Sequence, residues 1–132
     1  MKDMPATRAF SSPFPLPARI ERWFDERGWQ VRPHQFDMLE ADRAGRDALL
    51  ISSTGSGKTL AGFLPTLADL ADHPSEGLHT LYITPLKALT NDIERNLGAP
   101  IAEMGLPIVV ESRTGDTSGA ITSLRRASSS AL

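Results

Sequence analysis

The sequence contains no cysteine among its 132 residues. Disulfide bonds, thiolate metal sites and cysteine nucleophiles are therefore excluded, and the composition fits a reducing compartment. Aromatic residues make up only 6% of the chain, and no apolar run reaches the length of a signal peptide or a membrane span. These absences predict a soluble, cytoplasmic protein without a membrane partner.

An excess of positive charge is also missing. The chain has 14 Lys and Arg against 16 Asp and Glu, which gives a formal net charge of -2. Without an overall basic field, any nucleic-acid binding must rely on local contacts. The apolar fraction of 40% suffices for a hydrophobic core, and the length fits one domain of roughly 100 to 200 residues.

The two ends of the chain differ in composition from its middle. Residues 1–17 are rich in proline, which removes backbone donors, and they predict an extended arm. Apolar residues recur at helical spacing from Ala18, and a second helix is expected from Pro33, because proline fits a first turn. These elements predict a helical hairpin over 18–46. The small, polar segment 118–132 predicts a low-complexity, disordered tail.

Between these segments, residues 47–117 alternate between strand and helix patterns. The expected strands cover 47–53, 79–84 and 106–112, and amphipathic helices are expected between them. Strands and helices that alternate with short connections predict an α/β fold, in which a parallel sheet is covered by helices.

The segment Thr-Gly-Ser-Gly-Lys-Thr leaves the first expected strand and enters a helix. Gly55 and Gly57 allow positive φ and a close approach, so successive N–H groups can surround a polyphosphate. The helix that begins near Lys58 adds unpaired N–H groups and the positive end of its dipole. We expect Lys58 to reach the β- and γ-phosphates and the Thr59 hydroxyl to bind Mg²⁺. The predicted nucleotide-binding residues of this loop are Thr54, Gly55, Ser56, Gly57, Lys58 and Thr59.

A second candidate for nucleotide binding is Gln35, which lies near the start of the second expected helix. Its side-chain amide can accept a hydrogen bond from the adenine N6 amine and donate one to N7. Gln35 is therefore a candidate for adenine recognition.

Two further segments are candidates for nucleic-acid binding. Pro85 and Lys87 lie where an expected strand gives way to a helix, and helix N–H groups together with a lysine can bind backbone phosphates. Gly115 and Asp116 follow the last expected strand. They fit a nucleic-acid contact and an ordinary turn equally well.

In this order and spacing, these motifs resemble those of superfamily 2 DNA helicases. Residues 10–117 are similar to the N-terminus of bacterial Lhr-type helicases, in particular the ligase-associated DEXH-box group. The resemblance implies an incomplete RecA-like P-loop domain that uses ATP and Mg²⁺, with Gln35 selecting adenine. It also implies translocation on single-stranded DNA and a part in a ligase-linked DNA repair system. The nucleic-acid contacts that it implies are Pro85, Lys87, Gly115 and Asp116.

The Asp-Glu-x-His motif, with which the family holds Mg²⁺ and orients water, does not occur in the sequence. We therefore expect a truncated reading frame whose product binds ATP but neither hydrolyses it nor unwinds DNA on its own. Because later strands of the sheet are also missing, segment 47–53 is expected to expose unpaired edges and apolar side chains.

Two other functions stay open at this point. One is another class of P-loop protein, such as a small nucleotide kinase or GTPase, which a nucleotide competition assay would reveal. Alternatively, the chain is a noncatalytic module that binds DNA or a partner through the hairpin and the arm. That module would still bind DNA after Lys58→Ala, whereas a helicase-derived site would lose ATP binding.

Overall fold

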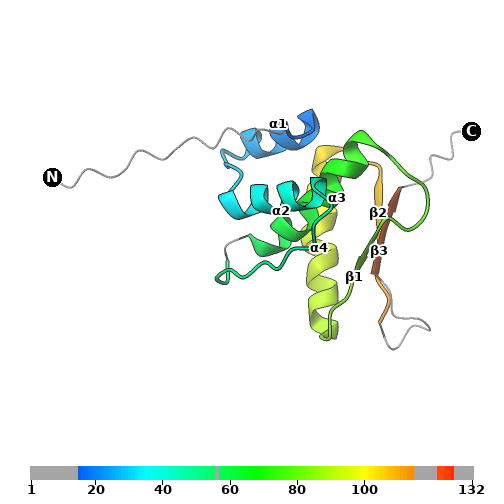
Figure 1. Ribbon diagram of the computed structural model, residues 1–132. Coiled ribbons are helices and arrows are strands. Elements are labelled where there is room, and N and C mark those ends of the chain that lie inside the picture. The colour runs from blue at the N-terminus through cyan, green and yellow to red at the C-terminus, as the bar shows by residue number, and fades with distance from the viewer. Residues whose placement is uncertain (1–14, 56, 115–121, 127–132) are drawn as a thin grey trace, which may run out of the picture.

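The computed structural model describes residues 15–55, 57–114 and 122–126, and Figure 1 shows helices on one side of the molecule and strands on the other. The helices are α1 (Ala18–Glu26), α2 (Pro33–Arg43), α3 (Lys58–Asp72) and α4 (Lys87–Met104). The strands are β1 (Thr80–Tyr82), β2 (Ile108–Glu111) and β3 (Thr122–Arg126).

The first two helices form where periodicity and capping residues predict them. In α1 the apolar residues Ile20, Trp23 and Phe24 are buried on one face. The helix ends at Glu26, and Gly28, two residues later, has a φ of 62° and donates its N–H to Asp25 O at 2.9 Å. Pro33 begins α2. Helix α1 packs mainly against α4, and α2 packs mainly against α3. The two helices of the expected hairpin therefore do not form a packed pair.

The hydrophobic core lies around α3. Leu64 and Leu67 of this helix are fully buried, and Leu70 is almost so. They share one cluster with Ile20 of α1 and Leu97 of α4. Pro65 lies inside α3 without ending it. Burial of these side chains therefore ties α1 and α4 to the helix that follows the glycine-containing loop.

The sheet differs from the predicted parallel arrangement. Its order is β1-β3-β2, and β3 pairs antiparallel with both neighbours. The α4 crossover makes β1 and β2 run in the same direction, as expected, but they do not pair with each other. The reason is that β3 returns after β2 and fills the space between them, where it supplies partners for their backbone groups. This strand lies in segment 118–132, for which only a low-complexity, disordered tail is expected.

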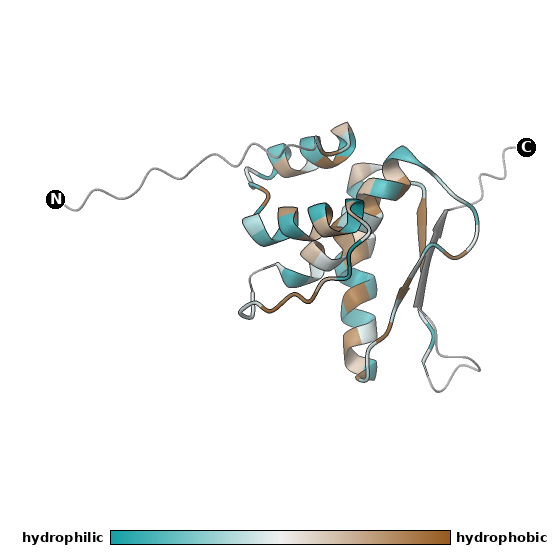
Figure 2. Ribbon diagram, viewed as in Figure 1, coloured by the Kyte–Doolittle hydropathy of each residue, from teal (hydrophilic) through white to brown (hydrophobic). Residues whose placement is uncertain are grey.

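The expected strand at 47–53 is also wrong, because these residues form coil. Leu49 and Ile51 are 85% and 84% exposed, and Figure 2 shows the apolar coil leading to α3. An apolar run becomes a strand only when another strand pairs with it, and the described residues provide none beside this segment. The expected exposure of apolar side chains in this segment is confirmed.

Polar contacts tie the far end of α3 to β1. His79 Nε2 lies 2.8 Å from Asp69 Oδ2, and the hydroxyls of Thr66 and Thr80 are 2.9 Å apart. The pKa of the Asp69 carboxyl is lowered, mainly by its hydrogen bond with His79. These contacts fix the start of β1, and with it the direction of the chain into α4.

Candidate nucleotide-binding site

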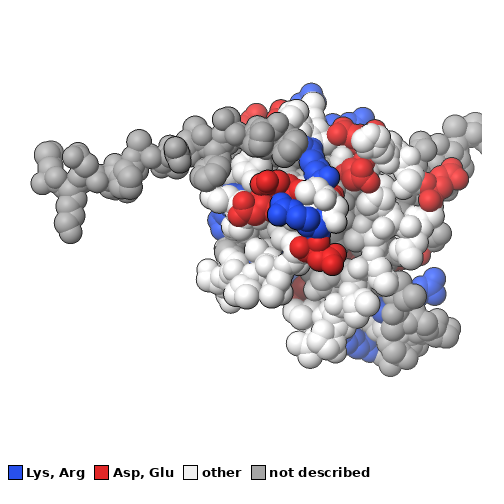
Figure 3. All heavy atoms as spheres, in the orientation of Figure 1, with Lys and Arg blue, Asp and Glu red and all other residues white. Residues whose placement is uncertain are grey.

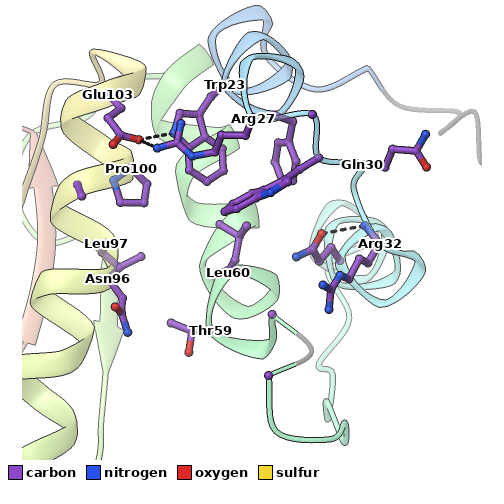
Figure 4. A pocket seen from close by; sticks show the side chains of 17 residues that line it. Trp23, Arg27, Gln30, Arg32, Thr59, Leu60, Asn96, Leu97, Pro100 and Glu103 are labelled. Carbon is purple, nitrogen blue, oxygen red and sulfur yellow. Dashed lines mark hydrogen bonds and ion pairs between the residues drawn. The ribbon is translucent and has the colours of Figure 1, made fainter.

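A pocket of about 710 Å³ lies between the helices. Its walls come from the end of α1 and the following turn, the start of α2, the loop before α3, and the C-terminal half of α4. Figure 4 shows Thr59 and Leu60 of α3 between Asn96 of α4 on one side and Arg32 on the other. The pocket is large enough for a nucleotide, since small-molecule sites span about 300 to 1,000 Å³.

The glycine-containing loop forms one end of this pocket. Gly55 and Gly57 line it and have φ values of 78° and 81°, a left-handed conformation that side chains disfavour. Gly57 is the N-cap of α3, and no side chain caps this end of the helix. The first-turn N–H groups therefore lack a side-chain acceptor, and an anion such as phosphate can provide it. The backbone here fits a polyphosphate.

The Lys58 ammonium group folds back over the same loop. Its Nζ donates a hydrogen bond to the carbonyl oxygen of Ser52 at 2.8 Å, while the side chain stays exposed. A phosphate oxygen at the loop would offer the ammonium a charged acceptor in place of this neutral one. The ammonium and a phosphate oxygen carry opposite charges, so the exchange adds a Coulomb attraction that the neutral carbonyl does not provide.

Gln35 meets the glycine-containing loop from the other side of the pocket. The residue is only 3% exposed, and its Oε1 accepts a hydrogen bond from the Arg32 N–H at 2.8 Å. With Oε1 held in this way, the Nε2 atom of Gln35 faces the loop. A Cβ atom added to Gly57 would lie 3.1 Å from this Nε2 atom. The structure therefore places the predicted adenine-recognition residue next to the predicted phosphate loop.

An aromatic wall that the sequence patterns did not reveal completes the pocket. Trp29, in the turn after α1, is 54% exposed and lines the pocket together with Trp23 and Arg27. The two indole rings meet edge to face with centroids 5.5 Å apart. An exposed aromatic ring beside a pocket offers a flat apolar surface on which a nucleobase can stack. The available signal was a tryptophan directly after the Gly28 turn and before Gln35.

The sequence matches the DEAD/DEAH box helicase family over residues 32–129, which is more than half of the chain. The matched range begins just before Gln35 and includes the glycine-containing loop. The chain belongs to the DEAD/DEAH box helicase family. Helicases of this family have a RecA-like α/β fold, use ATP, usually with Mg²⁺, and bind nucleic acid.

Individual helicases are also similar to this chain. The Lhr helicase/probable uracil glycosylase of Mycolicibacterium smegmatis is 43% identical over 113 residues, which cover 76% of this chain and 8% of that protein. The ATP-dependent helicase Lhr-Core of Sulfolobus acidocaldarius is 39% identical over 111 residues, or 76% of this chain and 13% of that protein. The uncharacterized ATP-dependent helicase YprA of Bacillus subtilis is 34% identical over 110 residues, which cover 83% of this chain and 14% of that protein.

These similarities confirm the resemblance to Lhr-type superfamily 2 helicases. The chain spans between 8% and 14% of the length of these three relatives. No solved structure matches the chain significantly. Within the described part of this helicase-family chain, no helix is both long and apolar enough to cross a membrane.

The predicted nucleic-acid residues lie away from the pocket. Pro85 and Lys87 are exposed at the N-terminal end of α4, whereas the pocket is lined by residues of its C-terminal half. Lys87 lies nine residues before Asn96, the first residue of α4 that lines the pocket, which is about 14 Å along the helix at 1.5 Å per residue. Gly115 and Asp116, like Ser56 of the loop, lie outside the described residues.

The expected Mg²⁺ ligand Thr59 lines the pocket with an exposed side chain, while Thr54 is exposed in the loop without lining it. The hydroxyl of Thr59 is an oxygen ligand of the kind that Mg²⁺ accepts. Across the part of the chain that the structure describes, no group of three or more His, Cys, Asp or Glu side chains can hold a metal ion. Thr59 is thus the one predicted metal ligand that the structure places at the pocket.

The Gly57→Ala substitution is expected to weaken ATP binding and to lower stability by about 1 kcal/mol, because alanine resists positive φ. The new Cβ would also press on Gln35 Nε2. Gly55→Ala is the matched control, since Gly55 has a similar φ but no atom within 4 Å of an added Cβ. Chemical denaturation should show similar losses of stability for both variants. Only Gly57→Ala should reduce the preference for ATP over GTP, and equal preferences in the two variants would contradict the contact.

Proposed function

We propose that the chain is an ATP-binding N-terminal part of an ATP-dependent DNA helicase of the Lhr type. The observation that carries this proposal is the direct approach of Gln35 to Gly57 at one pocket. The first residue is suited to adenine and the second to phosphate, so one nucleotide can satisfy both. The other P-loop classes, kinases and GTPases, do not explain a buried glutamine beside the loop.

In the proposed complex, adenine stacks on Trp29 and pairs with the amide of Gln35. The triphosphate extends to the start of α3, where backbone N–H groups and Lys58 bind its oxygens. Mg²⁺, held in part by Thr59, would neutralise phosphate charge when bound. In this proposal the chain alone does not hydrolyse ATP, because the Asp-Glu-x-His carboxylates are absent from its sequence.

Single-stranded DNA is the proposed nucleic-acid partner, with Pro85 and Lys87 as contacts. The first turn of α4 has no side-chain cap, so its N–H groups and the exposed Lys87 side chain suit backbone phosphates. Figure 3 shows acidic and basic side chains intermixed on the face in view, which supports local contacts rather than a broad basic surface. A link to ligase-associated DNA repair is proposed from the resemblance, and the uracil glycosylase in the name of one relative supports it.

The role of Gln35 can be tested with Gln35→Leu, which keeps the volume but removes the amide. We expect ATP to bind about 5- to 100-fold more weakly, the range of a lost bidentate base contact. GTP and inorganic tripolyphosphate should bind as they do to the wild type. Competition against a fluorescent ATP analogue measures all three ligands. Equal losses for ATP and tripolyphosphate would instead show that Gln35 only supports the loop through its bond to Arg32.

A further inference from the structure

Glu103, near the end of α4, joins two residues at the end of α1. The Trp23 indole N–H donates to Glu103 Oε2 at 2.7 Å, and the Arg27 guanidinium forms an ion pair with the same oxygen. Figure 4 shows both contacts beside Pro100, at the side of the pocket opposite Arg32. A single carboxylate oxygen therefore fixes an indole and a guanidinium relative to α4.

These two groups are in turn the neighbours of Trp29. The Arg27 guanidinium carbon lies 4.4 Å from the Trp23 ring centroid and 5.6 Å from that of Trp29. Both distances fall within the range of a cation–π contact. Trp23 also meets the Trp29 ring edge to face. Trp29 belongs to no helix and is more than half exposed, so these contacts set the direction of its ring.

We propose that Glu103 is a positioning residue for adenine. It holds Arg27 and Trp23 in place, and they hold the Trp29 ring as a ready-made wall of the pocket. This inference rests on the proposed ATP-binding function. A ring that is already ordered loses less conformational freedom when a base stacks on it, so the affinity for the nucleotide rises without a direct contact from Glu103.

The rest of the α1–α4 contact does not depend on Glu103. The Arg19 guanidinium donates to the carbonyl oxygen of Gly105, and Ile20 and Phe24 are buried in the shared core. The ion pair itself is partly exposed, and exposed pairs contribute little to folding. Loss of the Glu103 carboxylate should therefore leave the fold intact and act on the pocket wall.

The test compares Glu103→Ala with the matched control Glu26→Ala, which removes an exposed carboxylate from α1. In the full chain, Glu103→Ala should weaken ATP binding about 3- to 10-fold, as expected when a side chain must be ordered on binding. The affinity for inorganic tripolyphosphate should stay unchanged, because the phosphate loop is untouched. Glu26→Ala should bind both ligands like the wild type.

Tryptophan fluorescence gives a second readout, because the two tryptophans of the chain are Trp23 and Trp29. Acrylamide should quench the emission of Glu103→Ala more efficiently than that of the wild type or Glu26→Ala. Glu103→Gln keeps an oxygen acceptor and should restore part of the ATP affinity. If Glu103→Ala does not unfold cooperatively, Arg27→Met provides the same comparison from the other side of the ion pair, with Arg27→Lys as its conservative partner.

Two results would overturn the inference. In one, ATP affinity in Glu103→Ala equals that of Glu26→Ala; in the other, ATP and tripolyphosphate weaken by the same factor. A wild-type chain that binds neither ligand would overturn the proposed function itself, and this inference with it. A wild type that prefers ATP, together with an unaffected Glu103→Ala, would reject only the positioning role.

Discussion

Replacing Lys58 with alanine is expected to lower the affinity for MgATP roughly 10- to 150-fold, which corresponds to the loss of a hydrogen bond between charged groups. The Lys58 ammonium lies over the glycine-containing loop, 2.8 Å from the carbonyl oxygen of Ser52. Within residues 47–59, Lys58 is the only lysine, and this segment contains no arginine. Isothermal titration of wild type and variant measures the difference directly.

Lys87→Ala is the matched control for this substitution. It removes the same charge from an exposed lysine at the start of α4, away from the pocket. We expect this control to bind MgATP like the wild type. If Lys58→Ala also bound MgATP like the wild type, the loop would not be a phosphate site. DNA binding that persisted in such a variant would then favour a noncatalytic module.

The Leu64→Ala substitution should lower the free energy of unfolding by about 2 to 5 kcal/mol, because it leaves a cavity in the core. Leu64 is fully buried at the centre of α3, where α1 and α4 meet. A loss of this size is a large part of a total stability of about 5 to 15 kcal/mol, so the variant should be largely unfolded in mild urea. Urea denaturation followed by circular dichroism measures the effect.

Leu49→Ala makes the same chemical change at a leucine that is 85% exposed. Its effect should stay within about 0.5 kcal/mol, as is usual for surface substitutions. Similar urea midpoints for the two variants would contradict the core described here. Because the apolar coil of Leu49 and Ile51 faces solvent, both proteins should be compared at low concentration to limit association.

The helices could be predicted from the sequence because their signals are local. Buried Ile20 and Trp23 are three residues apart, Pro33 fits a first turn, and Gly28 follows the end of α1 with a positive φ. Each signal acts within one or two helical turns, so a single sequence contains it. The structure confirms these helices.

The strand arrangement could not be predicted because pairing is not local. The run at 47–53 has the composition of a buried strand, yet it forms coil in the absence of a neighbouring strand. In contrast, Thr122–Arg126 has a weak pattern but pairs with β1 and β2, whose open edges favour a third strand between them. Composition alone does not decide which segment finds a partner.

The residues of the candidate site also fall into those that the sequence predicts and those that it does not. The glycine-containing loop and Gln35 could be predicted, because their residue types and order carry a chemical meaning. Trp29 and Glu103 could not, because their role depends on how the turn after α1 packs against the end of α4. That packing joins residues far apart in the sequence.

The central claim, that the pocket binds adenosine triphosphate through the glycine-containing loop and Gln35, is tested most directly by titration of the wild-type chain with MgATP and MgGTP. We predict saturable binding of one MgATP per chain. MgGTP should bind at least about 10-fold more weakly, because guanine presents a carbonyl oxygen where adenine presents the N6 amine. Absence of MgATP binding, or equal affinity for the two nucleotides, would contradict the claim.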